Sequence, residues 1–355
     1  MAPVRICDVG GWTDTWFGSP GQVCSLAAGP GVTVTAATAP AQAGTPPIRV
    51  VASDIGLDHR FGPSPERGWA EPAPSAEPLL EHAVAEVVSS LDPRGRQPLE
   101  ITVSSAVPAG SSLGTSASVV VALMAAVRGL WSDDDCDPDE LAAAAHGVET
   151  SRARREAGVQ DQWAAACGGL LHLAIDTYPD VRRLPVEPSP GLLDELGERV
   201  VTVAFGRHDS SAVHQEVIRA FLTCDGVEHD RVRRASRDLA ALAGEAAARL
   251  ESGDVEGWAD VLTRSTDAQA RMHPDLVGPD HRRAIQVAEA SGAAGWKVNG
   301  AGGAGGSLSI VAPPSGRSAL EEALGDADPA WQVLDLRPVL SGVVVDRSPT
   351  GAPHP

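Results

Sequence analysis

Basic residues are scarce in this 355-residue sequence, which holds 28 lysines and arginines against 47 aspartates and glutamates. The formal net charge is therefore −19. Sequence-independent binding to nucleic acid or to an anionic membrane needs a basic surface, so this balance argues against both kinds of partner. Lysine occurs once, as Lys297. Arginine must therefore supply nearly every positive contact in any phosphate chemistry.

Cysteine is also sparse, with five scattered residues, no CxxC pair and an odd total. This pattern excludes a disulfide framework and a structural zinc site, and it fits a reducing cytosol. The sequence lacks any apolar run long enough to span a bilayer, and its first residues lack a basic start followed by an apolar run. We therefore expect a cytoplasmic protein that is neither exported nor inserted into a membrane.

Apolar periodicity predicts an α+β protein of two lobes. With 43% apolar residues, the chain can bury a large core. The expected lobes cover residues 1–185 and 186–347, with the proline-rich stretch 179–191 as a hinge or linker and 348–355 as a disordered tail. Strands are expected at 3–9, 31–38, 48–54, 98–106, 170–175, 200–206, 294–299 and 306–312. Helices are expected at 77–91, 114–130, 138–156, 211–221, 229–252, 255–271 and 280–291, and surface loops at 39–47 and 62–75.

A serine- and glycine-rich loop at 108–118 joins a predicted strand to a predicted helix. The N–H groups at a helix N-terminus favour an anion, and small residues let phosphate oxygens approach the main chain. Hydroxyl groups in the loop could add donors or a Mg²⁺ ligand. No lysine follows the second glycine, so the segment is not a Walker A loop.

Two other interpretations of this loop stay open. Serine-rich turns often serve only as helix caps. The residues 110–114 also satisfy the G-x-S-x-G pattern of a hydrolase elbow, which would make Ser112 a nucleophile in need of an acid and a histidine base. A serine hydrolase is therefore an alternative, although Pro108 interrupts the strand before the turn and no glycine-rich oxyanion segment precedes the serine.

A second glycine cluster occupies 300–306 and formally contains G-x-G-x-x-G. A dinucleotide fingerprint should open a helix, whereas the residues that follow here predict a strand. The cluster therefore indicates either a loop whose backbone approaches a phosphate or another chain segment, or a crowded β-turn.

Carboxylates mark two further segments. Asp161 lies between two glutamines and is either a capping or buried hydrogen-bonding residue or a general base. Glu149 could reach the same cleft as a metal ligand or lie on a solvated helix face. Near the start of the chain, a short strand runs into a glycine turn that carries Trp12 and Asp14. An aromatic ring with a carboxylate suits a sugar, and a turn-capping Asp14 is the alternative.

Taken together, these segments resemble the GHMP kinases, the superfamily of galactokinase, homoserine kinase and mevalonate kinase. The resemblance follows one order over most of the chain: residues 2–5 with 10–14, then 108–117, then 160–162 with 168–169, then 300–306. The G-G-x-T-D opening, the Q-D-Q triplet and the segment 205–211 are more similar to heptose 7-phosphate 1-kinases and L-fucokinases than to galactokinase. The resemblance implies a ribosomal-protein-like α/β N-terminal lobe and a ferredoxin-like α+β C-terminal lobe.

The resemblance also implies roles. It implies an ATP-dependent kinase that phosphorylates a sugar hydroxyl, and it favours the anomeric hydroxyl of a heptose, a heptose 7-phosphate or a deoxysugar. Asp161 and Arg5 match the catalytic pair, and Ser116 and Glu149 match the Mg²⁺ ligands. The residues that match the ATP loop are Gly110, Ser111, Ser112, Leu113, Gly114, Thr115 and Ser116. Those implied for the acceptor are Gly11, Trp12, Thr13, Asp14, Gln160, Arg207, Gly302 and Gly303.

The sequence departs from the family pattern at Ser112, where the family usually has glycine, and at Ala304, which interrupts the glycine run. Both residues are small, so we expect the two loops to keep their form. Alternatives remain a kinase of another small alcohol and a catalytically inactive binding or regulatory protein of the same fold. A homodimer is also left open.

Overall fold

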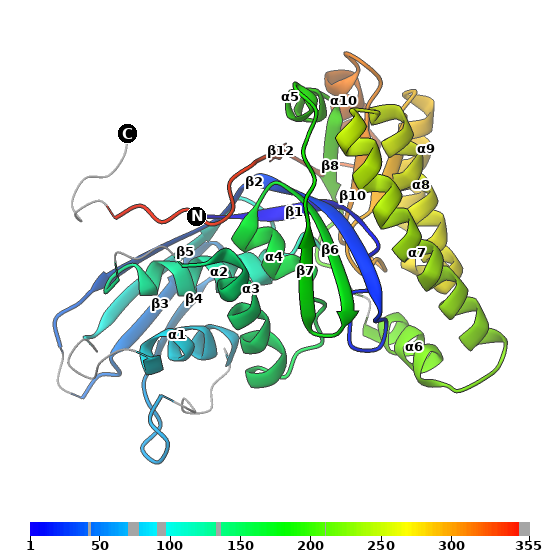
Figure 1. Cartoon of the computed structure of the whole chain (residues 1–355). Coiled ribbons are helices and arrows are strands. Elements are labelled where there is room, and N and C mark those ends of the chain that lie inside the picture. The colour runs from blue at the N-terminus through cyan, green and yellow to red at the C-terminus, as the bar shows by residue number, and fades with distance from the viewer. Residues whose placement is uncertain (42–43, 70–77, 91–96, 133–135, 210, 348–355) are drawn as a thin grey trace.

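The chain forms two sheets with separate sets of helices, as the computed structural model shows for residues 1–355 except 42–43, 70–77, 91–96, 133–135, 210 and 348–355. The predicted tail, parts of the loops expected at 39–47 and 62–75, and the first and last residues of the helix expected at 77–91 lie outside the described residues. The α+β, two-lobed prediction is confirmed (Figure 1).

The first sheet has the strand order β4-β3-β5-β2-β6-β7, and both β1 and β12 pair with β2. Neighbours in this sheet are antiparallel except β3 and β5, which run parallel. Its strands are β1 (Ala2–Val9), β2 (Gly21–Thr38), β3 (Ile48–Ala52), β4 (Leu57–Phe61), β5 (Leu99–Ser105), β6 (Leu170–Thr177), β7 (Asp180–Leu184) and β12 (Arg337–Pro338).

Strand β5 shows why this sheet has one buried face, since buried and exposed residues alternate along LEITVSS. Strand β1 is buried at every position, because helices and the second lobe cover it. The helices of this lobe are α1 (Pro78–Ser90), α2 (Thr115–Arg128), α3 (Pro138–Gly147) and α4 (Gln160–Cys167), with short turns η1 (Ser53–Ile55) and η3 (Val148–Arg152). Helix α2 begins directly after Gly114, whose φ of 74° lies in the left-handed region that glycine favours.

The second sheet has the order β11-β8-β10-β9, and all of its pairs are antiparallel. Its strands are β8 (Val200–Ala204), β9 (Gly295–Val298), β10 (Ser307–Val311) and β11 (Gln332–Leu334). The long antiparallel pair α7 and α8 lies beside it, at the right of Figure 1. The helices of this half are α5 (Leu192–Arg199), α6 (Ser211–Leu222), α7 (Val227–Ser252), α8 (Val255–Met272), α9 (Pro279–Ala290) and α10 (Arg317–Ala327), with the turn η4 (Pro274–Leu276).

The prediction of a linker at 179–191 is wrong for the first half of that stretch, because strand β7 lies there and pairs with β6. The helix predicted at 138–156 ends earlier: α3 stops at Gly147 and passes into the π-helical turn η3. The predicted division of the chain at 185/186 stays a prediction. After the second sheet the chain returns to the first, where β12 pairs with β2 and the Val344 N–H donates to the Met1 carbonyl at 2.8 Å.

None of the helices in the described residues is long and apolar enough to cross a membrane.

Candidate functional site

A cavity of about 410 Å³ opens where the end of β1, the loop before α2 and the glycine cluster of the second lobe meet. The structure therefore brings together residues that lie up to 296 positions apart, such as Arg5 and Ala301. The predicted residues that line the cavity are Arg5, Gly11, Trp12, Asp14, Gly110, Ser112, Leu113, Gly114, Thr115, Ser116, Glu149, Gln160 and Asp161.

Five predicted site residues lie outside this lining. Thr13 is buried in the turn, where its hydroxyl donates to the Gly10 carbonyl at 2.7 Å. Ser111 is buried and its carbonyl accepts from the Ser307 hydroxyl at 2.7 Å. Gly302 and Gly303 pack on η4, and the Gly303 N–H donates to the Leu276 carbonyl at 2.9 Å.

Arg207 is the fifth, an exposed residue whose backbone lies across Gly110 and Gly305. The next residue ties this segment to the loop, since the His208 N–H donates to the Gly110 carbonyl at 2.8 Å. The glycine cluster instead presents Gly300 and Ala301 to the cavity. Arg207 thus lies beside the serine-rich loop and not in the wall of the cavity.

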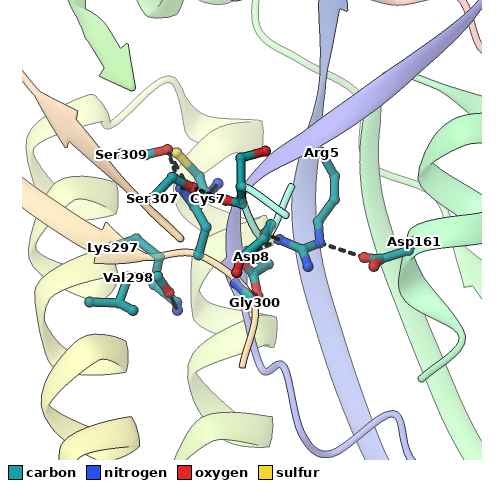
Figure 2. Close-up of polar contacts among 12 residues, drawn as sticks. Arg5, Cys7, Asp8, Asp161, Lys297, Val298, Gly300, Ser307 and Ser309 are labelled. Atoms are coloured by element: carbon teal, nitrogen blue, oxygen red, sulfur yellow. Dashed lines mark hydrogen bonds and ion pairs between the residues drawn. The ribbon is translucent and has the colours of Figure 1, made fainter. Parts of the chain in front are cut away.

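The centre of the site is an ion pair between Arg5 and Asp161. Arg5 Nε donates to Asp161 Oδ1 at 2.6 Å, and Figure 2 shows the guanidinium between Asp161 and Asp8. The arginine is 4% exposed and the Asp161 side chain 30%, so the carboxylate is the more accessible partner from the cavity. Burial alone would lower the pKa of Arg5, but the Asp161 and Asp8 carboxylates outweigh it and raise that pKa. Asp161 lies in the first turn of α4 and makes no side-chain cap, so the capping interpretation is not supported.

Asp8 links this pair to the second lobe. Its Oδ1 accepts from Arg5 Nη1 at 2.9 Å and from the Gly300 N–H at 3.0 Å. Lys297, the single lysine, is buried nearby, and its ammonium group donates to Gln269 at 3.0 Å and to the Val298 carbonyl (Figure 2). Burial lowers the pKa of Lys297, and Asp8 opposes that shift. The Asp8 carboxylate therefore lies between two buried cations.

The serine-rich loop meets the Arg5–Asp161 pair directly. A Cβ on Gly114 would lie 3.0 Å from Asp161 Cγ, so only glycine lets the loop pass so close. Within the described residues, Ser112 Oγ and Thr115 Oγ1 are buried and have no hydrogen-bond partner. Buried polar atoms normally find partners, so these two hydroxyls, which line the cavity, indicate a polar ligand there.

Ser116 and Glu149 form the next contact along the loop. The Ser116 hydroxyl donates to Glu149 Oε1 at 2.7 Å, and the Gln162 amide donates to the other carboxylate oxygen. Burial raises the pKa of Glu149, while its hydrogen bond from Ser116 acts in the opposite direction. The solvated-face interpretation of Glu149 is wrong, because the side chain is buried.

No group of three or more histidine, cysteine, aspartate or glutamate side chains gathers as a metal cage in the described part of the chain. Mg²⁺ seldom needs one, since it is usually held by one or two carboxylates, waters and substrate phosphates. One hydroxyl and one carboxylate beside an anion-binding loop fit that donor set.

The opposite wall carries Asp14. Its carboxylate is buried, and Oδ2 accepts from the Gln160 N–H at 3.1 Å. Burial raises the pKa of Asp14 to about 6, because this N–H bond and Arg5 only partly offset the burial and the like charge of Asp161. A Cβ on Gly158 would lie 2.2 Å from Asp14 Oδ2, so this glycine leaves room for the carboxylate.

Several lining residues were not predicted from the sequence. Glu156 accepts from the indole N–H of Trp16 at 2.7 Å, and the His214 ring lies 4.8 Å from the Trp12 ring. A signal existed for 155–158, which lie one residue before the Q-D-Q triplet, whereas nothing in the local sequence marks His214 as a residue of this cavity. The remaining lining residues are Thr15, Phe17, Ala117, Arg155, Ala157, Gly158, His208, Gly300 and Ala301.

The sequence and the fold of this chain are similar to those of known proteins. Residues 79–169, from α1 to the end of the α4 turn, match the GHMP kinases N terminal domain. The chain is 30% identical over 218 residues to the mevalonate kinase of Methanothermobacter thermautotrophicus, an alignment that covers 61% of this chain and 64% of that protein's own length.

Solved structures share the fold over nearly the whole chain. A D-glycero-D-manno-heptose 1-phosphate kinase from Bacteriodes thetaiotaomicron matches with a TM-score of 0.69 and 20% identity, and the match covers 96% of each chain. A putative sugar kinase from Campylobacter jejuni matches with a TM-score of 0.72 and 20% identity, over 96% of this chain and 95% of that one. Residues 79–169 of this chain therefore match the GHMP kinases N terminal domain, and the whole chain shares the two-lobed α+β fold of these solved kinases.

Proposed function

We propose that this protein is an ATP-dependent kinase that transfers the γ-phosphoryl group to a hydroxyl of a small sugar. The observation that carries the proposal is the Arg5–Asp161 pair, because its carboxylate reaches the cavity beside a loop with unpartnered hydroxyls. Phosphoryl transfer needs in-line positioning and neutralised phosphate oxygens more than covalent help from the protein, and these elements can supply both.

The reaction assigns one role to each side of the cavity. The loop before α2 binds the triphosphate through its N–H groups and through the hydroxyls of Ser112 and Thr115. The acceptor hydroxyl oxygen attacks the γ-phosphorus, the bond from that phosphorus to the β–γ bridging oxygen breaks, and ADP leaves. Asp161 accepts the proton that the hydroxyl loses.

Arg5 keeps Asp161 ready for this role. The Arg5 guanidinium lies 2.6 Å from the Asp161 carboxylate oxygen, and arginine stays charged at any working pH. The ion pair also fixes the direction of the carboxylate, since Arg5 is itself held by Asp8 and by the Ser112 carbonyl at 3.2 Å.

Ser116 and Glu149 are the residues proposed to hold Mg²⁺. When bound there with the nucleotide, Mg²⁺ supplies charge neutralisation on the phosphate oxygens. Gln162 orients Glu149 by donating to the carboxylate oxygen that Ser116 leaves free. This role matches the pattern in which outer-shell hydrogen bonds orient the ligands of a metal.

The sugar is proposed to occupy the wall formed by Gly11, Trp12, Asp14 and Gln160. The Trp12 indole N–H and Gln160 Oε1 are buried without a partner in the described residues, so this wall offers a donor and an acceptor to a bound molecule. The anomeric hydroxyl is the proposed target because of the resemblance to anomeric sugar kinases. Arg207, Gly302 and Gly303 are not included, since they lie outside the cavity lining.

The hydrolase alternative finds no support in the site. Its nucleophile would be Ser112, whose hydroxyl has no hydrogen-bond partner in the described residues and therefore no base to activate it.

The test is an ATP-consumption screen over heptoses, heptose 7-phosphates, fucose, galactose and homoserine, with phosphorus NMR to locate the new ester. We expect one sugar to stimulate ADP release. The variant Asp161→Ala should lose about 10²- to 10⁴-fold in kcat and still be stabilised by MgATP in a thermal-shift titration. Asp176→Ala, an exposed carboxylate away from the cavity, is the matched control. Ordinary turnover in Asp161→Ala would show that the assigned base is wrong.

A further inference from the structure

We propose that the acceptor of this kinase carries no anionic group, so that a free sugar is the substrate and its phosphorylated or carboxylated counterpart is not. This inference rests on the proposed function and deepens it. It follows from the charges that face the cavity, from the places of the arginines, and from the unpartnered atoms of the acceptor wall.

The lining carries an excess of negative charge. Four carboxylates face the cavity, Asp14, Glu149, Glu156 and Asp161, against two arginines. Glu149 lies beside the serine-rich loop, where a bound Mg²⁺ would neutralise its negative charge. The other three lie where an acceptor has to bind, so an anionic acceptor would meet like charges.

The two arginines that line the cavity do not lie on the acceptor wall. Arg5 is buried and already paired with both Asp8 and Asp161. Arg155 is exposed, and its backbone N–H donates to the Glu149 backbone carbonyl at 2.9 Å. Its charge also acts on the Glu149 carboxylate, where it partly offsets the rise in pKa that burial causes. Arg155 therefore serves the phosphate side of the cavity.

A sugar phosphate would need a cation on the acceptor wall, and the described residues of that wall offer none. Arg207, which the resemblance implied for the acceptor, lies outside the lining. His208 and His214 do face the cavity, but burial lowers the pKa of each ring. Both imidazoles are therefore neutral near pH 7.

The atoms that this wall does offer suit hydroxyl groups. Trp12 presents its ring and an unpartnered indole N–H, and Gln160 presents an unpartnered carbonyl oxygen. Phe17 lies 6.2 Å from the Trp12 ring and extends the apolar surface. Aromatic faces with a few fixed polar atoms bind the C–H faces and hydroxyls of a sugar.

The decisive experiment compares acceptors that differ only by an anionic group. The pairs are D-glycero-D-manno-heptose with its 7-phosphate and galactose with its 6-phosphate; mevalonate serves as a hydroxy-carboxylate. We expect kcat/KM for the better free sugar to exceed that of its phosphate by at least ~100-fold, because like charges meet in a desolvated site. A phosphorylated sugar or mevalonate that equals or exceeds the free sugars overturns the inference.

A charge-reversal variant tests the cause. Glu156 is exposed at the rim, so Glu156→Arg should fold, and it should raise kcat/KM for the phosphorylated member of a pair relative to the free one by about 10-fold. Glu156→Gln retains an acceptor for Trp16 and should shift the ratio less. Glu322→Arg makes the same charge change on an exposed face of α10 and should leave the ratio unchanged. An unchanged ratio in Glu156→Arg would contradict the proposed role of wall charge.

Calorimetric binding of the same pairs separates this inference from the proposed function. If no acceptor is phosphorylated while free sugars bind more tightly than their phosphates, the kinase proposal fails and the charge preference stands. If phosphoryl transfer occurs and the phosphate of a pair binds more tightly, the inference fails and the kinase stands.

Discussion

The carboxylate of Asp8 accepts the backbone N–H of Gly300 at 3.0 Å, across 292 positions of the sequence. The same oxygen accepts from Arg5 Nη1 at 2.9 Å, so one buried residue connects the glycine cluster of the second lobe to the proposed catalytic pair. Asp8 does not line the cavity. Its effect must pass through Arg5, which makes it a positioning residue.

Asp8→Asn keeps the size of the side chain and removes its charge. We expect kcat to fall about 10- to 100-fold, because a small displacement of Arg5 misplaces Asp161. The KM for ATP should change by less than about 3-fold, since the phosphate loop is untouched. Asp58→Asn, which breaks an exposed ion pair with Arg49, is the control and should leave kcat unchanged. A rise in KM without a fall in kcat would contradict the positioning role.

Asp14→Asn should stabilise the protein in a pH-dependent way. Burial raises the pKa of Asp14 to about 6 in the folded state, so the folded chain holds a proton that the unfolded chain has already released between about pH 4 and pH 6. Stability therefore falls as pH rises through this window, and the cost persists above it at up to about 3 kcal/mol.

The measurement is denaturant unfolding of both proteins at pH 4 and pH 7.5. Asparagine carries no charge and can still accept from the Gln160 N–H, so the variant should gain over the parent at pH 7.5 and little at pH 4. The groups that face Asp14 are Arg5, Asp161 and Tyr178. Acceptor KM should rise in the same variant. Equal gains at both pH values would show that ionisation of Asp14 is not the cause.

Gln162→Met tests the proposed metal ligand Glu149 by removing the hydrogen bond that Gln162 donates to its carboxylate. Methionine fills a similar volume but donates no hydrogen bond to Glu149, so the carboxylate loses its orientation. We expect the Mg²⁺ concentration for half-maximal ATP binding, measured by calorimetry, to rise about 10-fold or more. Activity should recover at high Mg²⁺. Gln332→Met, on exposed β11, is the control, and an unchanged Mg²⁺ dependence in Gln162→Met would remove Glu149 from the site.

Gly342→Ala tests how much the packing of the C-terminal segment 339–346 against the first lobe contributes to stability. A Cβ at this position would lie 2.0 Å from the Ala166 carbonyl oxygen, so the backbone has to move. We expect a loss of about 1–3 kcal/mol in the free energy of unfolding, the usual range for overpacking. Gly325→Ala, in α10 with open space around it, should be neutral or stabilising. Equal stabilities would mean that 339–346 detaches at little cost.

Much of the fold could be predicted from the sequence because local patterns carry it. The expected strands at 3–9, 48–54, 98–106 and 170–175 and most of the helices are present, since alternation and helical spacing reflect burial directly. Strand β2 was half missed, because Pro30 and its flanking glycines normally end a strand. It continues because its partners change along its length: β6 pairs with 21–26, β1 with 24–32, and β5 with 32–38.

The elements that were not predicted are the short strands β4, β7, β11 and β12 and the helices α4, α5 and α10. Strand β12 has two residues and exists because it pairs with β2. Arg5, Asp161, Ser116 and Glu149 were chosen from the ordered motifs of the sequence, and the structure places them in the lining of one cavity. Contacts such as Asp8 with Gly300 depend on how the lobes meet, and no local pattern in the sequence records that.

Because Lys297 is buried, its amine should react with amine-reactive reagents only when the surrounding structure opens. An acylating reagent finds one lysine in the chain, and in the folded state that amine is enclosed by Gln269 and the Val298 carbonyl. Burial lowers the pKa of Lys297 only while the amine is enclosed, so once it is exposed it reacts like an ordinary lysine. Acylation of Lys297 would therefore report how often the region around Asp8 opens, without any added label.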